Sequence, residues 1–142
     1  IGGKAMMLPP PGLAGDHQYA NCALAAAMIR YQDRIAVPLA ALKQGARSAR
    51  WPARMQRLAP GPLTGTREVW LDGGHNPAGG QALAATLAAM PARPTLLICG
   101  MLNTKDVAGY LRPLAPHAVQ LYAVSIPGEA NTLPAGVTAQ AA

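Results

Sequence analysis

The stretch Leu71-Asp72-Gly73-Gly74-His75-Asn76-Pro77-Ala78-Gly79-Gly80 decides the fold of this 142-residue chain. The apolar run at residues 69–71, which leads into it, predicts a short buried strand. The glycines after that run permit a sharp turn. Asn76 followed by Pro77 is typical of the first residues of a helix, and an Ala/Leu-rich segment continues that helix to Met90. The stretch is therefore expected to form a strand, a polar turn and a helix start.

Three polar side chains, those of Asp72, His75 and Asn76, lie in this turn. In α/β proteins ligands bind at such a corner, and the N–H groups at a helix start favour anions. The same residues are also common in ordinary polar turns that bind nothing. The turn taken alone leaves both interpretations open.

Apolar periodicity predicts alternating helices and strands along the rest of the chain. Helices are expected at residues 16–33, 37–45, 76–90 and 104–114, and strands at 55–59, 68–71, 94–99 and 118–124. The second helix is expected to stop at Gly45. The continuous apolar runs at 94–99 and 118–124 are typical of parallel strands. The predicted fold class is therefore α/β, with a mostly parallel sheet after residue 55.

A basic segment that contains a proline, residues 46–54, separates the first two helices from this α/β pattern. Pro52 interrupts helical structure, and no apolar periodicity crosses the segment. We expect a domain boundary there, which divides the chain into segments 1–46 and 47–142. Because the sequence starts with Ile1 and ends in alanine-rich sequence, we expect it to be a piece of a longer protein.

The chain carries a formal net charge of +6, and much of it gathers near the boundary. Arg47, Arg50, Arg54 and Arg57 recur every three or four residues. A nucleic-acid surface is one interpretation, but no nucleic-acid-binding motif accompanies these arginines. Guanidinium groups bind a small polyphosphate equally well. The sequence therefore favours a small phosphorylated ligand over nucleic acid.

Apolar runs and cysteines restrict the class of protein further. No apolar run approaches the ~18 residues that span a membrane, and no segment has the pattern of a secretory leader. Cys22 and Cys99 lack metal-binding or redox spacing, and two buried thiols are typical of a reducing compartment. We expect a cytoplasmic protein that does not bind membranes and has no metal site of its own.

Five motifs in order carry a resemblance to a known family. They are LAGDHQYAN at residues 13–21, WPAR at 51–54, LDGGHNP at 71–77, GMLNTKD at 100–106 and IPGEA at 126–130. Together they resemble the bifunctional dihydrofolate synthase/folylpolyglutamate synthase family of the Mur ligase superfamily. The family has glycine where Ala53 stands and alanine where Gly74 stands.

This resemblance implies an ATP-dependent ligase, in which a carboxylate is phosphorylated by ATP and glutamate attacks the acyl phosphate. The substrates would be ATP, L-glutamate and dihydropteroate or a folate. Residues 1–46 would end a central ATPase domain, and residues 47–142 would form most of a Rossmann-like C-terminal domain. The phosphate-loop pattern GxxxxGK[ST] occurs nowhere in the sequence. The loop and the Mg²⁺ ligands would therefore precede this chain, which alone would be inactive.

Roles for individual residues follow from positions that match the family motifs. Asn21 matches the asparagine that hydrogen-bonds adenine, Arg54 the arginine that reaches the phosphates, and Asp72 the aspartate that accepts the ribose hydroxyls. His75 is a candidate catalytic residue that faces the phosphates or glutamate, or it braces the turn. Lys105 is a further candidate for substrate contact.

Two other functions remain open. A stand-alone nucleotide-binding or interaction module could use the same fold, because a fold alone does not settle function. A Mur-type peptidoglycan ligase belongs to the same superfamily. The His-Gln-x-x-Asn and Trp-Pro-x-Arg motifs favour the folate branch over that ligase.

Overall fold

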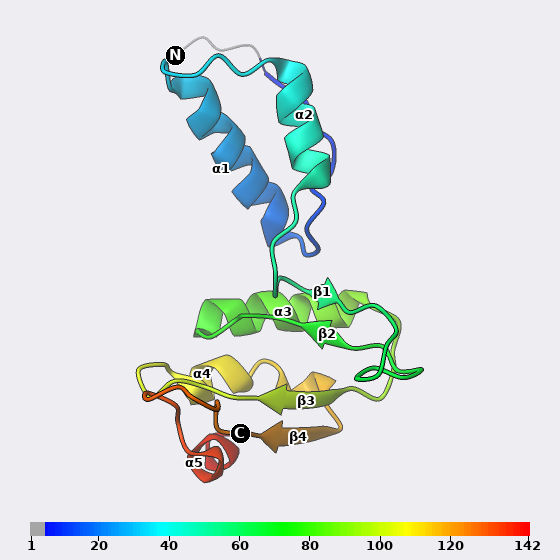
Figure 1. Cartoon of the computed structure of the whole chain (residues 1–142), viewed down its shortest axis with the longest axis vertical. Coiled ribbons are helices and arrows are strands. Elements are labelled where there is room, and N and C mark those ends of the chain that lie inside the picture. The colour runs from blue at the N-terminus through cyan, green and yellow to red at the C-terminus, as the bar shows by residue number, and fades with distance from the viewer. Residues whose placement is uncertain (1–4) are drawn as a thin grey trace. The chain divides into compact units, whose positions relative to one another are not determined.

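The computed structural model describes residues 5–142, so residues 1–4 of the predicted first segment lie outside it. The chain forms two compact units, Ile1–Asp72 and Gly73–Ala142. The predicted boundary after residue 46 would separate the end of an ATPase domain from a C-terminal domain. It stays a prediction. The elements, in chain order (Figure 1), are α1 (His17–Tyr31), α2 (Leu39–Ser48), β1 (Gln56–Arg57), β2 (Trp70–Leu71), α3 (Pro77–Ala89), β3 (Leu96–Cys99), α4 (Val107–Leu111), the 3₁₀ helix η1 (Ala115–His117), β4 (Gln120–Ala123) and α5 (Ala135–Gln140).

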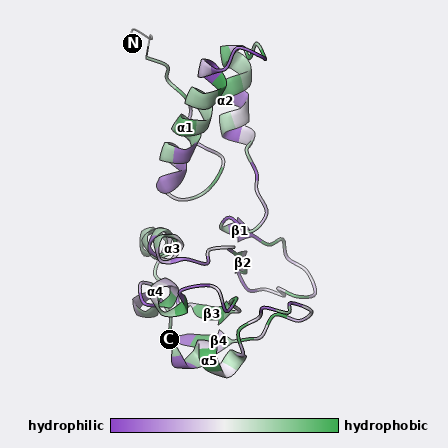
Figure 2. Ribbon diagram, turned by 90° about the vertical axis from the view of Figure 1, so that its left-hand side faces the viewer, coloured by the Kyte–Doolittle hydropathy of each residue, from purple (hydrophilic) through white to green (hydrophobic). Residues whose placement is uncertain are grey.

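Helices α1 and α2 form the first part of the first unit. Helix α1 lies where the sequence predicts a helix, and hydrophobic residues run along it (Figure 2), several of them exposed to solvent. Helix α2 continues through Gly45 to Ser48, so the predicted stop at Gly45 is wrong. The helical hydrogen bonds continue past Gly45, because the Ala49 N–H donates to the Gly45 carbonyl at 2.9 Å. Within residues 5–142, no helix combines the length and apolar character that crossing a membrane requires.

A short antiparallel pair of strands, β1 and β2, completes the first unit. Gln56 lies opposite Leu71, and Arg57 lies opposite Trp70. Arg57 forms an ion pair with Glu68, and its guanidinium carbon lies 6.0 Å from the centre of the Trp70 ring. Both strands are shorter than predicted. This pair departs from the predicted parallel arrangement because one loop joins its strands, whereas a parallel pair needs a longer crossover.

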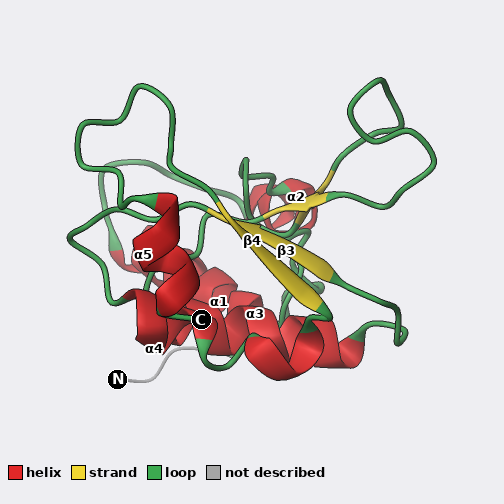
Figure 3. Cartoon of the chain, turned by 90° about the horizontal axis from the view of Figure 1, so that it is seen from below, coloured by secondary structure: helices red, strands yellow, loops and turns green. Residues whose placement is uncertain are grey.

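Strands β3 and β4 form the parallel sheet of the second unit (Figure 3). Their register runs from Leu96 opposite Gln120 to Cys99 opposite Ala123. Helix α4 and η1 supply the crossover that parallel strands require. The parallel pairing predicted for these two apolar runs is therefore confirmed. One face of the sheet remains exposed, however, with Ile98 76% accessible.

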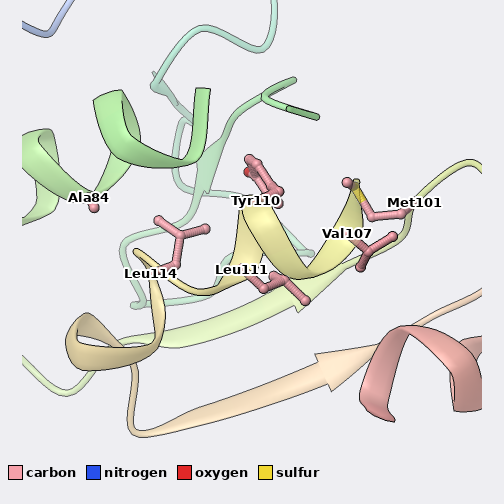
Figure 4. Close-up of a cluster of buried hydrophobic side chains, with 6 residues drawn as sticks. All are labelled: Ala84, Met101, Val107, Tyr110, Leu111 and Leu114. Carbon is pink, nitrogen blue, oxygen red and sulfur yellow. The ribbon is translucent and has the colours of Figure 1, made fainter. Parts of the chain in front are cut away.

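The core of the second unit lies between this sheet and its helices (Figure 4). Its buried members come from α3, from the loop after β3 and from the region of α4: Ala84, Met101, Val107, Tyr110, Leu111 and Leu114. Helices α3 and α4 approach closely at Gly80, where a side-chain Cβ would overlap the Tyr110 carbonyl oxygen. This close approach fixes the packing of α3 against α4.

Thr138 of α5 gives a first prediction about stability. Its side chain is fully buried, and among the described residues its hydroxyl has no hydrogen-bond partner. A buried unsatisfied polar group costs about 1–3 kcal/mol. Valine has nearly the same shape without the hydroxyl, so we expect Thr138→Val to raise the free energy of unfolding by about 1 kcal/mol.

Urea unfolding followed by circular dichroism measures this change. The control Thr138→Ser keeps the hydroxyl and removes the methyl group, so it should lower the stability. A Thr138→Val variant that is less stable than the parent chain would show that the hydroxyl makes a stabilising hydrogen bond.

Candidate functional site

Arg54 lies in a strained turn of the first unit. We call residues Ala53–Met55 the arginine turn. Ala53 has φ +52° and Met55 has φ +42°, so both lie in the left-handed region. This region costs a non-glycine residue about 1–2 kcal/mol. Met55 is buried, whereas Arg54 between them is exposed. Strain of this kind persists only where surrounding structure enforces it, and it gathers at functional sites.

Two hydrogen bonds hold the arginine turn. The Met55 N–H donates to Asp72 Oδ2 at 2.9 Å, and the Ala53 N–H donates to Gln56 Oε1 at 3.0 Å. Asp72 directly follows β2, so the pairing of β1 with β2 brings it to the turn. The sequence named both Arg54 and Asp72 as candidates. It did not indicate their connection, because no sequence pattern links a carboxylate to a backbone N–H 17 residues away.

The second unit begins with the rest of the polar turn. Asn76 Oδ1 accepts the Gly79 N–H at 2.8 Å, and Pro77 occupies the start of α3, so the predicted helix start is confirmed. His75 Nδ1 lies 2.9 Å from the Gly73 carbonyl oxygen. Because a carbonyl only accepts, Nδ1 carries the proton, and in the neutral ring Nε2 is an acceptor. His75 is exposed and is linked to its own turn.

Asn21, the predicted adenine contact, lies on the exposed side of α1. Its Nδ2 donates to Gln18 Oε1 at 3.2 Å, and Gln18 Nε2 lies 2.8 Å from His17 Nε2. Gln18 is only 6% accessible. It therefore orients the Asn21 amide, a role that the sequence analysis missed. Helical spacing is the signal that could have found it, since side chains three positions apart are neighbours.

The other candidate positions are explained mainly by local structure. Lys105 is half-buried in the loop before α4, and Asp106 caps that helix by accepting the Gly109 N–H at 2.9 Å. Burial raises the pKa of the Cys99 thiol above its ordinary value, which makes it a poor nucleophile at neutral pH. Among residues 5–142, no three His, Cys, Asp or Glu side chains gather in a way that could hold a metal ion.

The residues of the first unit that match ligand-binding motifs offer complementary chemistry. The Arg54 guanidinium supplies a rigid fork of donors that suits phosphate oxygens. The Asp72 carboxylate supplies acceptors that suit hydroxyl groups, and the Asn21 amide can both donate and accept. Phosphate, sugar hydroxyls and a base are the three parts of a nucleotide. The structure links Asp72 to the arginine turn through the Met55 N–H, and it places Asn21 on α1 beside Gln18.

Comparison with known proteins identifies the class of this chain. Residues 53–142 match the family described as "Mur ligase, glutamate ligase domain", and the chain belongs to this family. Its relatives are named folylpolyglutamate synthases. The one from Lacticaseibacillus casei is 32% identical over 125 residues, which cover 86% of this chain and 28% of that protein. The chain thus spans less than a third of the length of the curated relatives it matches.

Solved structures support the same assignment. A Mycobacterium tuberculosis folylpolyglutamate synthase complexed with ADP and AMPPCP matches 94% of this chain and 28% of its own, with 32% identity and a TM-score of 0.78. A bifunctional folylpolyglutamate synthase/dihydrofolate synthase with Mn, AMPPNP and L-glutamate bound matches 97% of this chain and 31% of its own, with 28% identity and a TM-score of 0.76. The predicted family and the predicted α/β fold class are both confirmed.

Ala53 gives a second prediction, because it stands in the left-handed region where the family motif has glycine. Glycine removes about 1–2 kcal/mol of strain there and adds about 0.5–1 kcal/mol of unfolded-state entropy. We expect Ala53→Gly to raise the free energy of unfolding of the first unit by roughly 0.5 kcal/mol. Fluorescence of Trp51 and Trp70 during urea unfolding reports on this unit.

Gly65 offers a matched control in the same unit. It has φ +55°, and no atom lies within 4 Å of where its Cβ would be. Gly65→Ala should therefore lower stability through backbone strain alone. If Ala53→Gly also lowered it, the left-handed conformation of Ala53 would not be a source of strain.

Proposed function

We propose that this chain is the nucleotide-facing C-terminal part of an ATP-dependent ligase that adds L-glutamate to dihydropteroate or a folate. One observation carries the proposal: Arg54 projects from a strained turn that is hydrogen-bonded to Asp72. Strain of this kind is maintained at sites that act on a ligand. The names and bound nucleotides of the related proteins point to ATP and to glutamate.

The proposed reaction has two steps. A carboxylate oxygen of dihydropteroate or folate attacks the γ-phosphorus of ATP, which gives an acyl phosphate and ADP. The amino nitrogen of glutamate then attacks the carbonyl carbon. Inorganic phosphate leaves with one oxygen of the former carboxylate, and the nitrogen loses a proton as the amide forms.

The residues of this chain would contribute mainly by binding and orientation. Arg54 would contact the phosphate oxygens and stabilise the charge that moves during phosphoryl transfer. Asp72 would accept the ribose hydroxyls, and Asn21 would hydrogen-bond adenine. His75 is a candidate to accept the proton from the attacking amine through Nε2, since its Nδ1 proton is held by Gly73.

Phosphoryl transfer also needs a phosphate loop and Mg²⁺. The pattern GxxxxGK[ST] does not occur in this sequence, and residues 5–142 contain no cluster that could hold a metal ion. We therefore propose that another part of the same protein supplies the loop and the Mg²⁺ ligands. Such a ligase would work in the cytoplasm, in line with the absence of metal or redox spacing between Cys22 and Cys99.

Ligation assays test the proposal with the 142-residue chain and with the protein obtained by extending its reading frame upstream. We expect no amide product from the chain alone. The extended protein should contain a phosphate loop and should convert ATP, glutamate and dihydropteroate or a folate to ADP, phosphate and a glutamylated product.

Other outcomes would favour other functions. Turnover by the pure chain that Asp72→Ala abolishes would show that no further segment is required. An upstream frame with no phosphate loop, together with no ligation, would favour a stand-alone nucleotide-binding or interaction module. Glutamate addition to a peptidoglycan precursor but not to folates would favour a Mur-type peptidoglycan ligase.

A further inference from the structure

We propose that Asp72 is a positioning residue for Arg54, in addition to its proposed contact with ribose. Its carboxylate holds the arginine turn through the Met55 N–H. The inference rests on the proposed function, because it explains how Arg54 is kept ready for phosphate. It couples the two residues through the backbone of the arginine turn.

The strand register explains why a side chain is needed at this point. The ladder of β1 and β2 ends with Gln56 opposite Leu71. The next pair along the register would be Met55 opposite Asp72, but the left-handed φ of Met55 takes the backbone out of strand geometry. The Leu58 N–H donates to the Val69 carbonyl, and hydrogen-bonded pairs alternate along an antiparallel ladder, so Met55 opposite Asp72 would be a pair without ladder hydrogen bonds. The Met55 N–H therefore has no ladder acceptor, and the Asp72 side chain accepts it instead. This hydrogen bond ties Met55, the residue after Arg54, to the end of β2.

The conformation of the turn makes this hydrogen bond important. A carboxylate acceptor gives roughly twice the strength of a neutral hydrogen bond. The Met55 residue is buried, so its N–H would lose a good partner if the carboxylate were removed. The left-handed residues on either side of Arg54 would then relax, and the guanidinium would move. A misplacement of about 1 Å can lower a rate on the order of 10²-fold.

The two roles of Asp72 are compatible. A carboxylate has about four lone-pair sites, so holding the Met55 N–H does not prevent it from accepting ribose hydroxyls. The roles predict different kinetics, however. A ribose contact alone would affect mainly KM for ATP, because binding that is uniform in ground and transition states does not change kcat. If Asp72 also positions Arg54, its replacement would lower kcat as well.

Trypsin digestion of the 142-residue chain tests the geometry without any activity. Trypsin cleaves after arginine in extended backbone, so the left-handed turn should protect the Arg54–Met55 bond. We expect Asp72→Ala to speed cleavage of this bond about tenfold or more, as losing a hydrogen bond to a charged group implies. Asp72→Asn keeps a neutral acceptor oxygen, so its cleavage rate should lie between those of the parent and Asp72→Ala.

The Arg47–Ser48 bond at the end of α2 is an internal control in the same unit. Its cleavage rate should stay unchanged in both variants when fragments are quantified by mass spectrometry. Equal acceleration at both bonds would mean that Asp72 stabilises the whole unit, and would overturn the specific role. Unchanged cleavage after Arg54 in Asp72→Ala would overturn it as well.

A double-mutant cycle in the extended protein tests the functional consequence. We expect Asp72→Ala to lower kcat about tenfold or more, and Asp72→Asn to restore most of it. In the Arg54→Ala background, Asp72→Ala should have no further effect on kcat. Effects on kcat that multiply, or an effect of Asp72→Ala on KM alone, would contradict the inference. If Arg54→Ala itself left kcat unchanged, the proposed role of Arg54 would fail instead.

Discussion

Replacing Arg54 with alanine is expected to lower kcat for ATP-dependent glutamate ligation about 10²-fold, with a smaller change in KM for ATP. The guanidinium projects from a turn whose backbone is held on both sides by hydrogen bonds to Gln56 and Asp72. A preorganised charge needs no reorganisation when the γ-phosphoryl group begins to transfer. Under the proposed function, the Arg54 charge would therefore stabilise the transition state more than the bound ground state.

Steady-state kinetics at saturating glutamate and folate measure this effect in the protein that includes the phosphate loop. Arg54→Lys is the matched variant, since it keeps the charge and loses the planar fork, so its kcat should lie between those of the parent and Arg54→Ala. A rise in KM at constant kcat would instead show that Arg54 binds ground state and transition state equally.

Replacing Gly80 with alanine is expected to lower the free energy of unfolding of the second unit by about 3 kcal/mol. The added Cβ would overlap the Tyr110 carbonyl oxygen and crowd the Pro113 ring. A backbone carbonyl cannot rotate away as a flexible side chain can. Helices α3 and α4 must therefore separate, which loosens the packing around Ala84 and Leu114.

Hydrogen exchange of β3 and urea unfolding followed by circular dichroism measure this loss. Gly136→Ala in α5 is the control, because no atom lies within 4 Å of where its Cβ would be. It should leave the stability unchanged or raise it, by up to about 1 kcal/mol. A Gly80→Ala variant as stable as the parent would contradict the close approach of the two helices.

Much of the fold could be predicted because it depends on residues close together in sequence. The Asn76 cap with Pro77 behind it follows from side-chain chemistry within one helical turn. The parallel pairing of β3 and β4 follows from two apolar runs separated by a helical crossover. The first helix and the family resemblance could be predicted for the same reason. The apolar periodicity of the helix and each family motif lie within short, continuous segments.

The features that could not be predicted depend on contacts across the chain or on strained backbone. Gly45 was expected to end α2, but glycine only weakens a helix, and the ladder continues through it. The antiparallel pairing of β1 with β2 depends on a loop whose path the sequence does not state. The left-handed conformations of Ala53 and Met55 run against local propensity. The hydrogen bonds that hold them, from Ala53 to Gln56 and from Met55 to Asp72, became visible only in the structure.

An isotope-transfer experiment tests most directly whether this chain serves a ligase that works through an acyl phosphate. The extended protein is given ATP, glutamate and a folate or dihydropteroate whose reacting carboxylate carries ¹⁸O. With both oxygens of that carboxylate labelled, the account predicts that each inorganic phosphate released with a glutamylated product carries one ¹⁸O atom. Product formation with unlabelled phosphate, or ATP consumption with no glutamylated product, would contradict it.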